Sequence, residues 1–212
     1  MRSSSLALLC LTGCLGTDLD FESDGSSMRA IAGGDGSTVV QICAGPRGLL
    51  TCNEDESFHV AMGGAVEAAA PASGLAFGTL SATLSADRGT VTVTRDRDGA
   101  TASGVVPEPF SLSGPSGQVS SATLRWTPSG QGDRMHWDAL VSCPSQSSGL
   151  DGADTADDGE VTIRAGDLPG AAGCEVTVRL RRERDGSLGA GWQDGSVMMA
   201  AQQREVAFTL TP

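Results

Sequence analysis

The chain contains no lysine and no tyrosine, only one asparagine and two histidines, and aromatic residues make up 4% of its 212 positions. All 14 basic residues are therefore arginines, and 26 acidic residues bring the net charge to −12. A protein that binds nucleic acid without sequence preference needs a basic surface. The composition therefore argues against a nucleic-acid partner, and equally against adhesion to anionic lipid through protein charge.

A long apolar run is also missing. The longest run near the N-terminus extends from Leu6 to Leu11, whereas a helix needs about 20 apolar residues to span a bilayer. Behind the positive charge of Arg2, this run fits the core of a short signal peptide. An ordinary secretory signal with a chance cysteine, or a cytosolic N-terminus, would be the alternatives.

The run ends in Leu11-Thr12-Gly13-Cys14, which resembles the bacterial lipobox. We therefore predict a lipoprotein signal peptide over residues 1–13, cleavage before Cys14, and acylation of the Cys14 thiol. Two or three acyl chains at one residue give stable anchoring. Leu15 follows the cysteine in place of aspartate, which favours an exported protein held at the outer membrane through Cys14.

Residues 14–37 are rich in Gly, Ser and Asp, which predicts a flexible acidic tether after the anchor. From Thr38 onward the dominant pattern is alternation with a period of two, typical of half-buried strands. Phe58, Val60 and Met62 alternate in this way, with His59 on the other side. The clearest further runs are Ala122, Leu124 and Trp126; Met135, Trp137, Ala139 and Val141; Cys174, Val176, Val178 and Leu180; and Val206, Phe208 and Leu210.

No window of eleven or more residues carries a convincing helical stripe. We therefore expect an all-β, immunoglobulin-like fold, built as one large or two small antiparallel β-sandwiches behind the tether. Residues 80–84 and 90–94 are predicted to form a hairpin across Gly89. Three prolines between Pro107 and Pro115 suggest a boundary, which gives a first β-module over 38–114 and a second, immunoglobulin-like one over 115–212.

Six cysteines are present. Once Cys10 has left with the signal peptide and Cys14 is acylated, four remain: Cys43, Cys52, Cys143 and Cys174. An even number in an exported chain indicates disulfides. Three pairings are possible, and we favour Cys43–Cys52 and Cys143–Cys174 because each pair lies inside one proposed module. The spacing lacks a C-x-x-C knuckle, which argues against a zinc site.

Several segments in the second half also resemble known sequences. They are Pro107-Glu108-Pro109-Phe110, Leu124-Arg125-Trp126-Thr127-Pro128-Ser129-Gly130, Asp157-Asp158-Gly159-Glu160-Val161-Thr162-Ile163, Gly173-Cys174-Glu175-Val176-Thr177-Val178-Arg179-Leu180 and Arg204-Glu205-Val206-Ala207-Phe208. In this order they resemble a set of uncharacterised lipoproteins from myxobacteria and related GC-rich bacteria. The Trp126 strand end also resembles fibronectin-type and immunoglobulin-like modules, in which a strand tryptophan fills the core. The resemblance implies no enzymatic activity.

Catalytic motifs are missing as well. The sequence contains no Gly-x-Ser-x-Gly elbow, no His-Glu-x-x-His and no P-loop or dinucleotide fingerprint. His59 and His136 both alternate away from the presumed core, whereas a Ser-His-Asp triad needs a buried, oriented histidine. We therefore predict a protein that is not an enzyme and has no cofactor. A pair of glycosidase carboxylates is the least specific alternative.

Three weaker candidate sites remain. Five carboxylates in ten residues, Asp151, Asp154, Asp157, Asp158 and Glu160, offer the oxygen ligands that Ca²⁺ prefers. Their spacing departs from the EF-hand pattern, and a solvated acidic turn is the simpler interpretation. Trp192, in a Gly-rich stretch, is either a wet platform for sugar stacking or a loop aromatic folded onto the core.

The third candidate is a basic cluster formed by Arg179, Arg181, Arg182 and Arg184. We interpret it as a charged outer face that discourages edge pairing, in preference to an anion or polysaccharide contact. The function predicted from these observations is that of a membrane-anchored, non-enzymatic lipoprotein that exposes β-sandwich modules for envelope structure or interaction. The alternative is a carbohydrate- or ligand-binding surface module, and the protein or polysaccharide partner is left open.

Overall fold

The computed structural model of the chain describes residues 25–44, 55–72, 78–144 and 146–211. These residues form strands almost throughout, with one short 3-10 helix, η1 (Ala165–Asp167). Among them there is no helix long and apolar enough to cross a membrane. The strands are β1 (Ser27–Ala32), β2 (Thr38–Cys43), β3 (Phe58–Met62), β4 (Ala65–Ala68), β5 (Ala70–Pro71), β6 (Leu80–Leu84), β7 (Gly89–Arg95), β8 (Thr101–Val106), β9 (Leu112–Ser113), β10 (Gln118–Val119), β11 (Ser121–Trp126), β12 (Arg134–Cys143), β13 (Gln146–Thr155), β14 (Glu160–Arg164), β15 (Glu175–Asp185), β16 (Ser187–Leu188) and β17 (Val197–Leu210).

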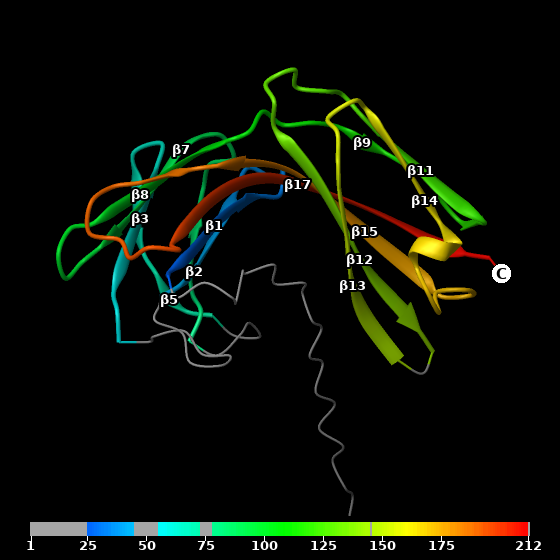
Figure 1. Ribbon diagram of the computed structural model, residues 1–212, viewed down its shortest axis with the longest axis horizontal. Helices are drawn as coiled ribbons and strands as arrows, with labels where there is room; N and C mark the ends of the chain where they lie inside the picture. Colours follow the sequence, from blue (N-terminus) through cyan, green and yellow to red (C-terminus); the bar gives the residue numbers. More distant parts are fainter. Residues whose placement is uncertain (1–24, 45–54, 73–77, 145, 212) are drawn as a thin grey trace, which may run out of the picture.

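The strands form three sheets. A nine-stranded sheet has the order β13-β12-β15-β17-β1-β2-β6-β5, with β10 also pairing β17. A five-stranded sheet, β16-β8-β7-β3-β4, accompanies one end of it, and a three-stranded sheet, β14-β11-β9, accompanies the other. Each small sheet encloses its own hydrophobic core against the large one. The fold is therefore two β-sandwiches side by side, which share one sheet (Figure 1).

Strand β17 shows how two cores arise from one strand. Its even-numbered side chains share a face: Met198 and Ala200 lie in the first core, and Phe208 and Leu210 lie in the second. Between them come Gln202 and Arg204, both polar, so the apolar stripe is interrupted at the junction without any break in the strand. Figure 1 shows β15 and β17 curving from one sandwich into the other.

The all-β sandwich class predicted from the alternation is confirmed, and so are the predicted inward faces. Phe58, Val60 and Met62 are buried, as are Leu124, Trp126 and Trp137. The choice between one large and two small sandwiches has an intermediate answer, because the cores are separate while the sheet is common to both. His59 points outward as expected and pairs with Asp96, Nδ1 to Oδ1 at 2.6 Å.

The predicted tether over 14–37 is wrong for its last part. Ser27–Ala32 forms β1, which is almost entirely buried and pairs β17 in parallel and β2 antiparallel. The polar residues Ser27 and Arg29 make this strand look solvent-exposed in the sequence, yet both are buried in the fold. The signal peptide predicted over residues 1–13, and residues 14–24 with the predicted acylation site Cys14, lie outside the described residues.

The predicted hairpin between residues 80–84 and 90–94 is also wrong. Strand β6 pairs β2 and β5 in the large sheet, while β7 pairs β3 and β8 in the five-stranded sheet. The turn at Asp87 therefore crosses from one layer to the other. Both strands bury apolar side chains in the same core, so their alternation is real although they are not paired.

The predicted boundary at residue 115 does not divide the fold. Strand β16 and the start of β17, from the second half of the chain, complete the first sandwich by pairing β8 and β1. The proline-rich stretch does mark the point where the chain leaves the first core, since Val106 lies in the first core and Phe110 in the second. The first sandwich therefore needs strands from both sides of that stretch, whereas the second core is built from Phe110 onward.

Candidate functional site

The junction between the two cores is held by Arg182, whose side chain is 2% exposed. It lies on the face of β15 that also carries Leu180 and the second core. Its guanidinium donates to the carbonyl oxygens of Glu108, at 3.1 Å, and Thr127, and pairs with Asp157 at 3.2 Å. The same group lies over the ring of Phe110, 4.9 Å from its centre. One arginine therefore ties three connecting segments to the shared sheet.

Asp157, the acidic partner of Arg182, collects a second set of hydrogen bonds. Its carboxylate accepts hydrogen bonds from the Trp126 indole at 2.7 Å and from the Ser129 amide and hydroxyl, both at 2.8 Å. Burial raises the pKa of Asp157, but the Ser129 and Trp126 hydrogen bonds and the charge of Arg182 outweigh it and leave the pKa below its ordinary value. Asp157 is thus a structural anion that fixes the strand end beyond Trp126.

A second ionic cluster lies on the face of the large sheet that points away from the second core. Asp138 of β12 faces Arg179 of β15 in register. Its carboxylate lies 2.6 Å from Nε of Arg179 and 3.1 Å from a terminal nitrogen of Arg181. Glu183 adds a contact of 3.1 Å to Nε of Arg181. All four side chains are less than a tenth exposed.

These positions correct the prediction for the arginine cluster. Asp138 lies on the face of β12 opposite to Trp137 and Ala139, yet it is buried as well. The cluster of Arg179, Arg181 and Arg182 is therefore not a charged outer face of an edge strand. The reason is topological: β15 is an interior strand, paired with β12 on one side and β17 on the other. Arg184 is the most exposed of the four arginines and pairs with Asp133 at 2.7 Å.

His136 lies at the border of this cluster, next to the edge strand β13. Its Nδ1 is 2.8 Å from Asp154 and its Nε2 is 3.3 Å from Asp151, and both carboxylates are more than two-thirds exposed. Two residues three apart in a regular strand would point to opposite faces. Here a register shift between Trp137 and Asp138 brings both to one face. An added Cβ at Gly152 would lie 2.0 Å from the Trp137 carbonyl oxygen, so the bulge requires glycine.

The carboxylates predicted as a calcium site are separated by this geometry. Asp151 and Asp154 engage His136, Asp157 points inward to Arg182, and Glu160 lies on β14, 3.4 Å from Arg125. Asp158 lies in the exposed turn before β14. In the parts of the chain that the structure describes, no group of three or more His, Cys, Asp or Glu residues could hold a metal ion.

Trp192 is folded onto the first core. Its ring stacks parallel to Phe58 with centres 6.3 Å apart, and the guanidinium of Arg95 lies 4.8 Å from the ring centre. The indole N–H donates to the Thr101 carbonyl at 2.8 Å. A sugar platform needs a wet ring, so this packing counts against the binding role predicted for Trp192.

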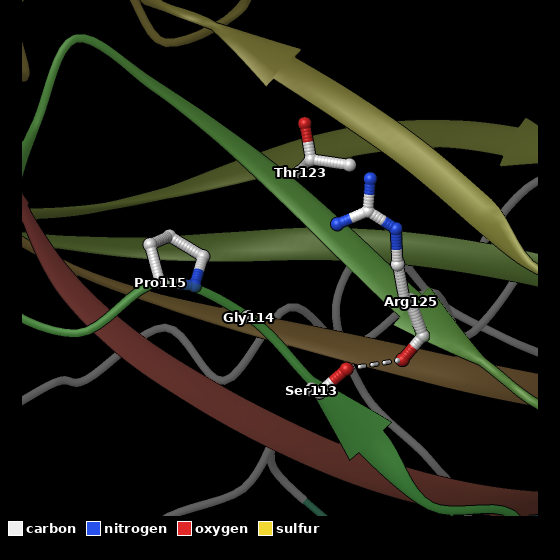
Figure 2. Close-up of a pocket in the computed structure, with 5 residues that line it drawn as sticks. All are labelled: Ser113, Gly114, Pro115, Thr123 and Arg125. Carbon is white, nitrogen blue, oxygen red and sulfur yellow. Dashed lines mark hydrogen bonds between the residues drawn. The ribbon is translucent and has the colours of Figure 1, made fainter.

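One surface depression lies on the three-stranded sheet, beside β9 and β11 (Figure 2). It has a volume of about 350 Å³ and is lined by Ser113, Gly114, Pro115, Thr123 and Arg125. The Ser113 hydroxyl donates to the Arg125 carbonyl at 3.3 Å, and the Arg125 guanidinium is 3.4 Å from Glu160. Its only charged lining group is thus already neutralised by a neighbour, which leaves little to hold a charged ligand.

The disulfide predicted between Cys143 and Cys174 is present and joins the end of β12 to the segment before β15. Cys43 is also disulfide-bonded. Its predicted partner, Cys52, lies outside the described residues, so the Cys43–Cys52 pairing stays a prediction.

Sequence reasoning missed the importance of Asp138, Gly152 and Asp157. The sequence did hold a signal for Asp138. Two neighbouring strands can neutralise each other when one carries an acid and the other carries arginines at alternating positions. The roles of Gly152 and Asp157 depend on which segment lies across from them, and no local pattern gives that information.

Similarity of this chain to known proteins is found only among solved structures. No protein-family model matches the chain, and no curated protein matches it. Among solved structures, the chicken CNTN1 FN1–FN3 domains match with a TM-score of 0.28 and 8% identity, over 90% of this chain and 64% of that one. The chicken interferon gamma receptor alpha chain matches with a TM-score of 0.25 and 13% identity, over 90% of this chain and 98% of that one. At these TM-scores the fold rests on the chain's own strands and not on the likeness.

Proposed function

We propose that this chain is a membrane-anchored, non-enzymatic lipoprotein whose two fused β-sandwiches present an interaction surface in the bacterial envelope. The observation that carries the proposal is that the charged side chains pair with one another. Wherever basic and acidic side chains gather among the described residues, at the junction, on β12 and β15 and around His136, they contact one another and hold strands together. A hydrolase would need such titratable side chains together in one cleft, whereas here they stabilise the contacts between strands.

The shared strands support the same proposal. Domains joined by a flexible linker move relative to each other by default, and many enzymes use such motion to close over a substrate. Here β15 and β17 continue through the junction, and Arg182 and Asp157 fix the connecting segments against them. Such a rigid body suits a spacer or a docking surface at the end of a tether.

Anchoring is tested by feeding cells an alkyne-tagged palmitate analogue and following label in the purified protein. We expect label and membrane fractionation in the natural chain and in Cys10→Ser, and loss of both in Cys14→Ser. The two cysteines are four residues apart, so Cys10→Ser is a matched control. Label that persists in Cys14→Ser would refute the anchor.

The interaction role is tested by crosslinking the anchored protein in cells and comparing it with Cys14→Ser. A discrete partner captured only by the anchored form supports the proposal. Turnover of ester, peptide or glycoside substrates by the purified protein, abolished by a point substitution in His136 or Asp151, would overturn the non-enzymatic assignment.

A further inference from the structure

Strand β13 is an edge of the large sheet, and we infer that it is the docking edge of this protein, where an extended basic segment of a partner adds as a further strand. This inference deepens the proposed interaction role and rests on it. Pairing to a free edge is a recurrent mode of peptide recognition, in which backbone hydrogen bonds supply affinity and alternate side chains supply specificity.

The edge formed by β13 is unusually long. Strand β13 has ten residues and pairs only with β12 in the part of the chain that the structure describes. The other strands at the ends of the sheets are much shorter: β14 has five residues, β4 has four, and β5, β9 and β16 have two each. Proteins usually keep exposed edges short because a long one is a template for pairing.

The composition of β13 also suits the addition of a strand. From Gln146 to Gly149 its residues are small or polar and exposed, with no proline and no charge. An approaching backbone therefore meets neither a bulky side chain nor a missing N–H group. On the inward face, Leu150 packs against the second core, so an apolar side chain of an added strand would extend that core.

The charge of β13 selects a basic segment as the added strand. Because of the bulge at Gly152, Asp151 and Asp154 stand on the outward face, 73% and 71% exposed. Opposite charges on neighbouring strands stabilise a sheet, and like charges facing each other destabilise it. A second copy of this chain, with net charge −12, would bring the same carboxylates to the edge. A segment with arginine or lysine at alternate positions would instead neutralise them.

The test uses the purified mature chain and a ten-residue peptide in which arginine alternates with valine. Isothermal titration should show saturable binding, and hydrogen exchange should show new protection in β13 and not in β14. Two matched peptides serve as controls. One carries glutamate in place of arginine, and the other is N-methylated at every second backbone nitrogen, which removes the donors that a strand pair needs.

The matched protein variants are Asp151→Arg with Asp154→Arg, and Asp158→Arg with Glu160→Arg on the neighbouring turn. The first pair should weaken binding of the arginine peptide by about tenfold or more, and the second should leave it nearly unchanged. Circular dichroism checks that both variants fold.

Equal binding of the arginine and N-methylated peptides, or protection away from β13, would overturn the docking edge. Equal loss in both variant pairs would mean attraction by net charge alone and would overturn it too. Either result leaves the anchoring experiment untouched, because that experiment reads label at Cys14 and not binding at β13.

Discussion

At the scale of single residues, buried ions decide how this protein is held together. Arg182 and Asp157 form a pair in which both side chains are less than a tenth exposed. Burying charges is costly unless each finds its partners. Here the Arg182 guanidinium also donates to two carbonyl oxygens, and Asp157 also accepts hydrogen bonds from Ser129 and Trp126.

Arg182→Ala should therefore destabilise the fold strongly, because it leaves Asp157 buried without its counter-charge. We expect the free energy of unfolding in urea to fall by about 3–5 kcal/mol. Arg88→Ala is the control, since Arg88 is 71% exposed and pairs with Asp87 of the same turn, and it should change stability by less than about 0.5 kcal/mol. Equal effects of the two substitutions would contradict the role assigned to Arg182.

Asp157 predicts how stability depends on acid. Its pKa in the folded protein lies below its ordinary value, so its contribution is complete above the pKa of the unfolded chain, about 3.9. That contribution is lost as the pH falls through the lower, folded-state pKa. Urea unfolding from pH 7 to pH 2 should show a smaller acid-induced loss in Asp157→Asn than in the natural chain.

The matched control for Asp157 is Asp158→Asn, in the next and exposed position. This variant should follow the acid dependence of the natural chain. If the two substitutions flatten the curve equally, the acid sensitivity does not come from the buried carboxylate.

At the scale of secondary-structure elements, β12 and β13 carry the most informative irregularity. Their ladder shifts register between Trp137 and Asp138, and the shift is possible because Gly152 has no side chain. An added Cβ would lie 2.5 Å from a ring carbon of Trp137 as well as against its carbonyl oxygen. The bulge thus depends on one glycine and sets the directions of Asp151 and Asp154.

Gly152→Ala should force β13 away from β12 at the bulge. We expect a loss of about 1–3 kcal/mol, as for overpacked sites, and faster amide exchange in β13. Gly166→Ala is the matched control because nothing lies within 4 Å of its added Cβ. Unchanged exchange in β13 would show that the strand tolerates a side chain there.

The Cys143–Cys174 disulfide acts at the same scale, by tying β12 to the start of β15. It closes a loop with a sequence separation of 31, which the chain-entropy model values at about 3–4 kcal/mol. The double variant with serine at both positions should unfold at correspondingly lower urea concentration. A change below about 1 kcal/mol would indicate that residual structure already restrains the unfolded chain.

At the scale of the whole molecule, the shared sheet makes the two sandwiches one unit. Strands β15 and β17 make the most extensive pairing in the fold, eleven residues in register from Glu175 to Asp185. Unfolding of these strands in one sandwich would therefore also disrupt the other sandwich. The N-terminal strand β1, parallel to β17, closes the first core with residues from the opposite end of the chain.

We therefore expect a single cooperative thermal transition. In scanning calorimetry the measured enthalpy should equal the van't Hoff enthalpy. Two resolved transitions, or a first sandwich that melts while the second keeps its tryptophan signal, would show that the junction does not couple the cores.

The sequence by itself determined the all-β class and the inward faces of most strands, because a half-buried strand must alternate apolar and polar side chains wherever it lies in the fold. It also allowed the Cys143–Cys174 pairing to be chosen. The partners of the strands were decided only by the tertiary structure. Thus β6 and β7 have the alternation of a hairpin and still belong to different sheets.

The charged groups also show the difference between what the local sequence determines and what the tertiary structure decides. Alternation correctly places Arg179 and Asp138 away from the core, but it assumes that this direction leads to water. Whether it does depends on whether β15 is an edge or an interior strand, which is a property of long-range pairing and not of local sequence. Only the fold decided that these ions neutralise each other, and that β13 pairs with β12 alone among the residues that the structure describes.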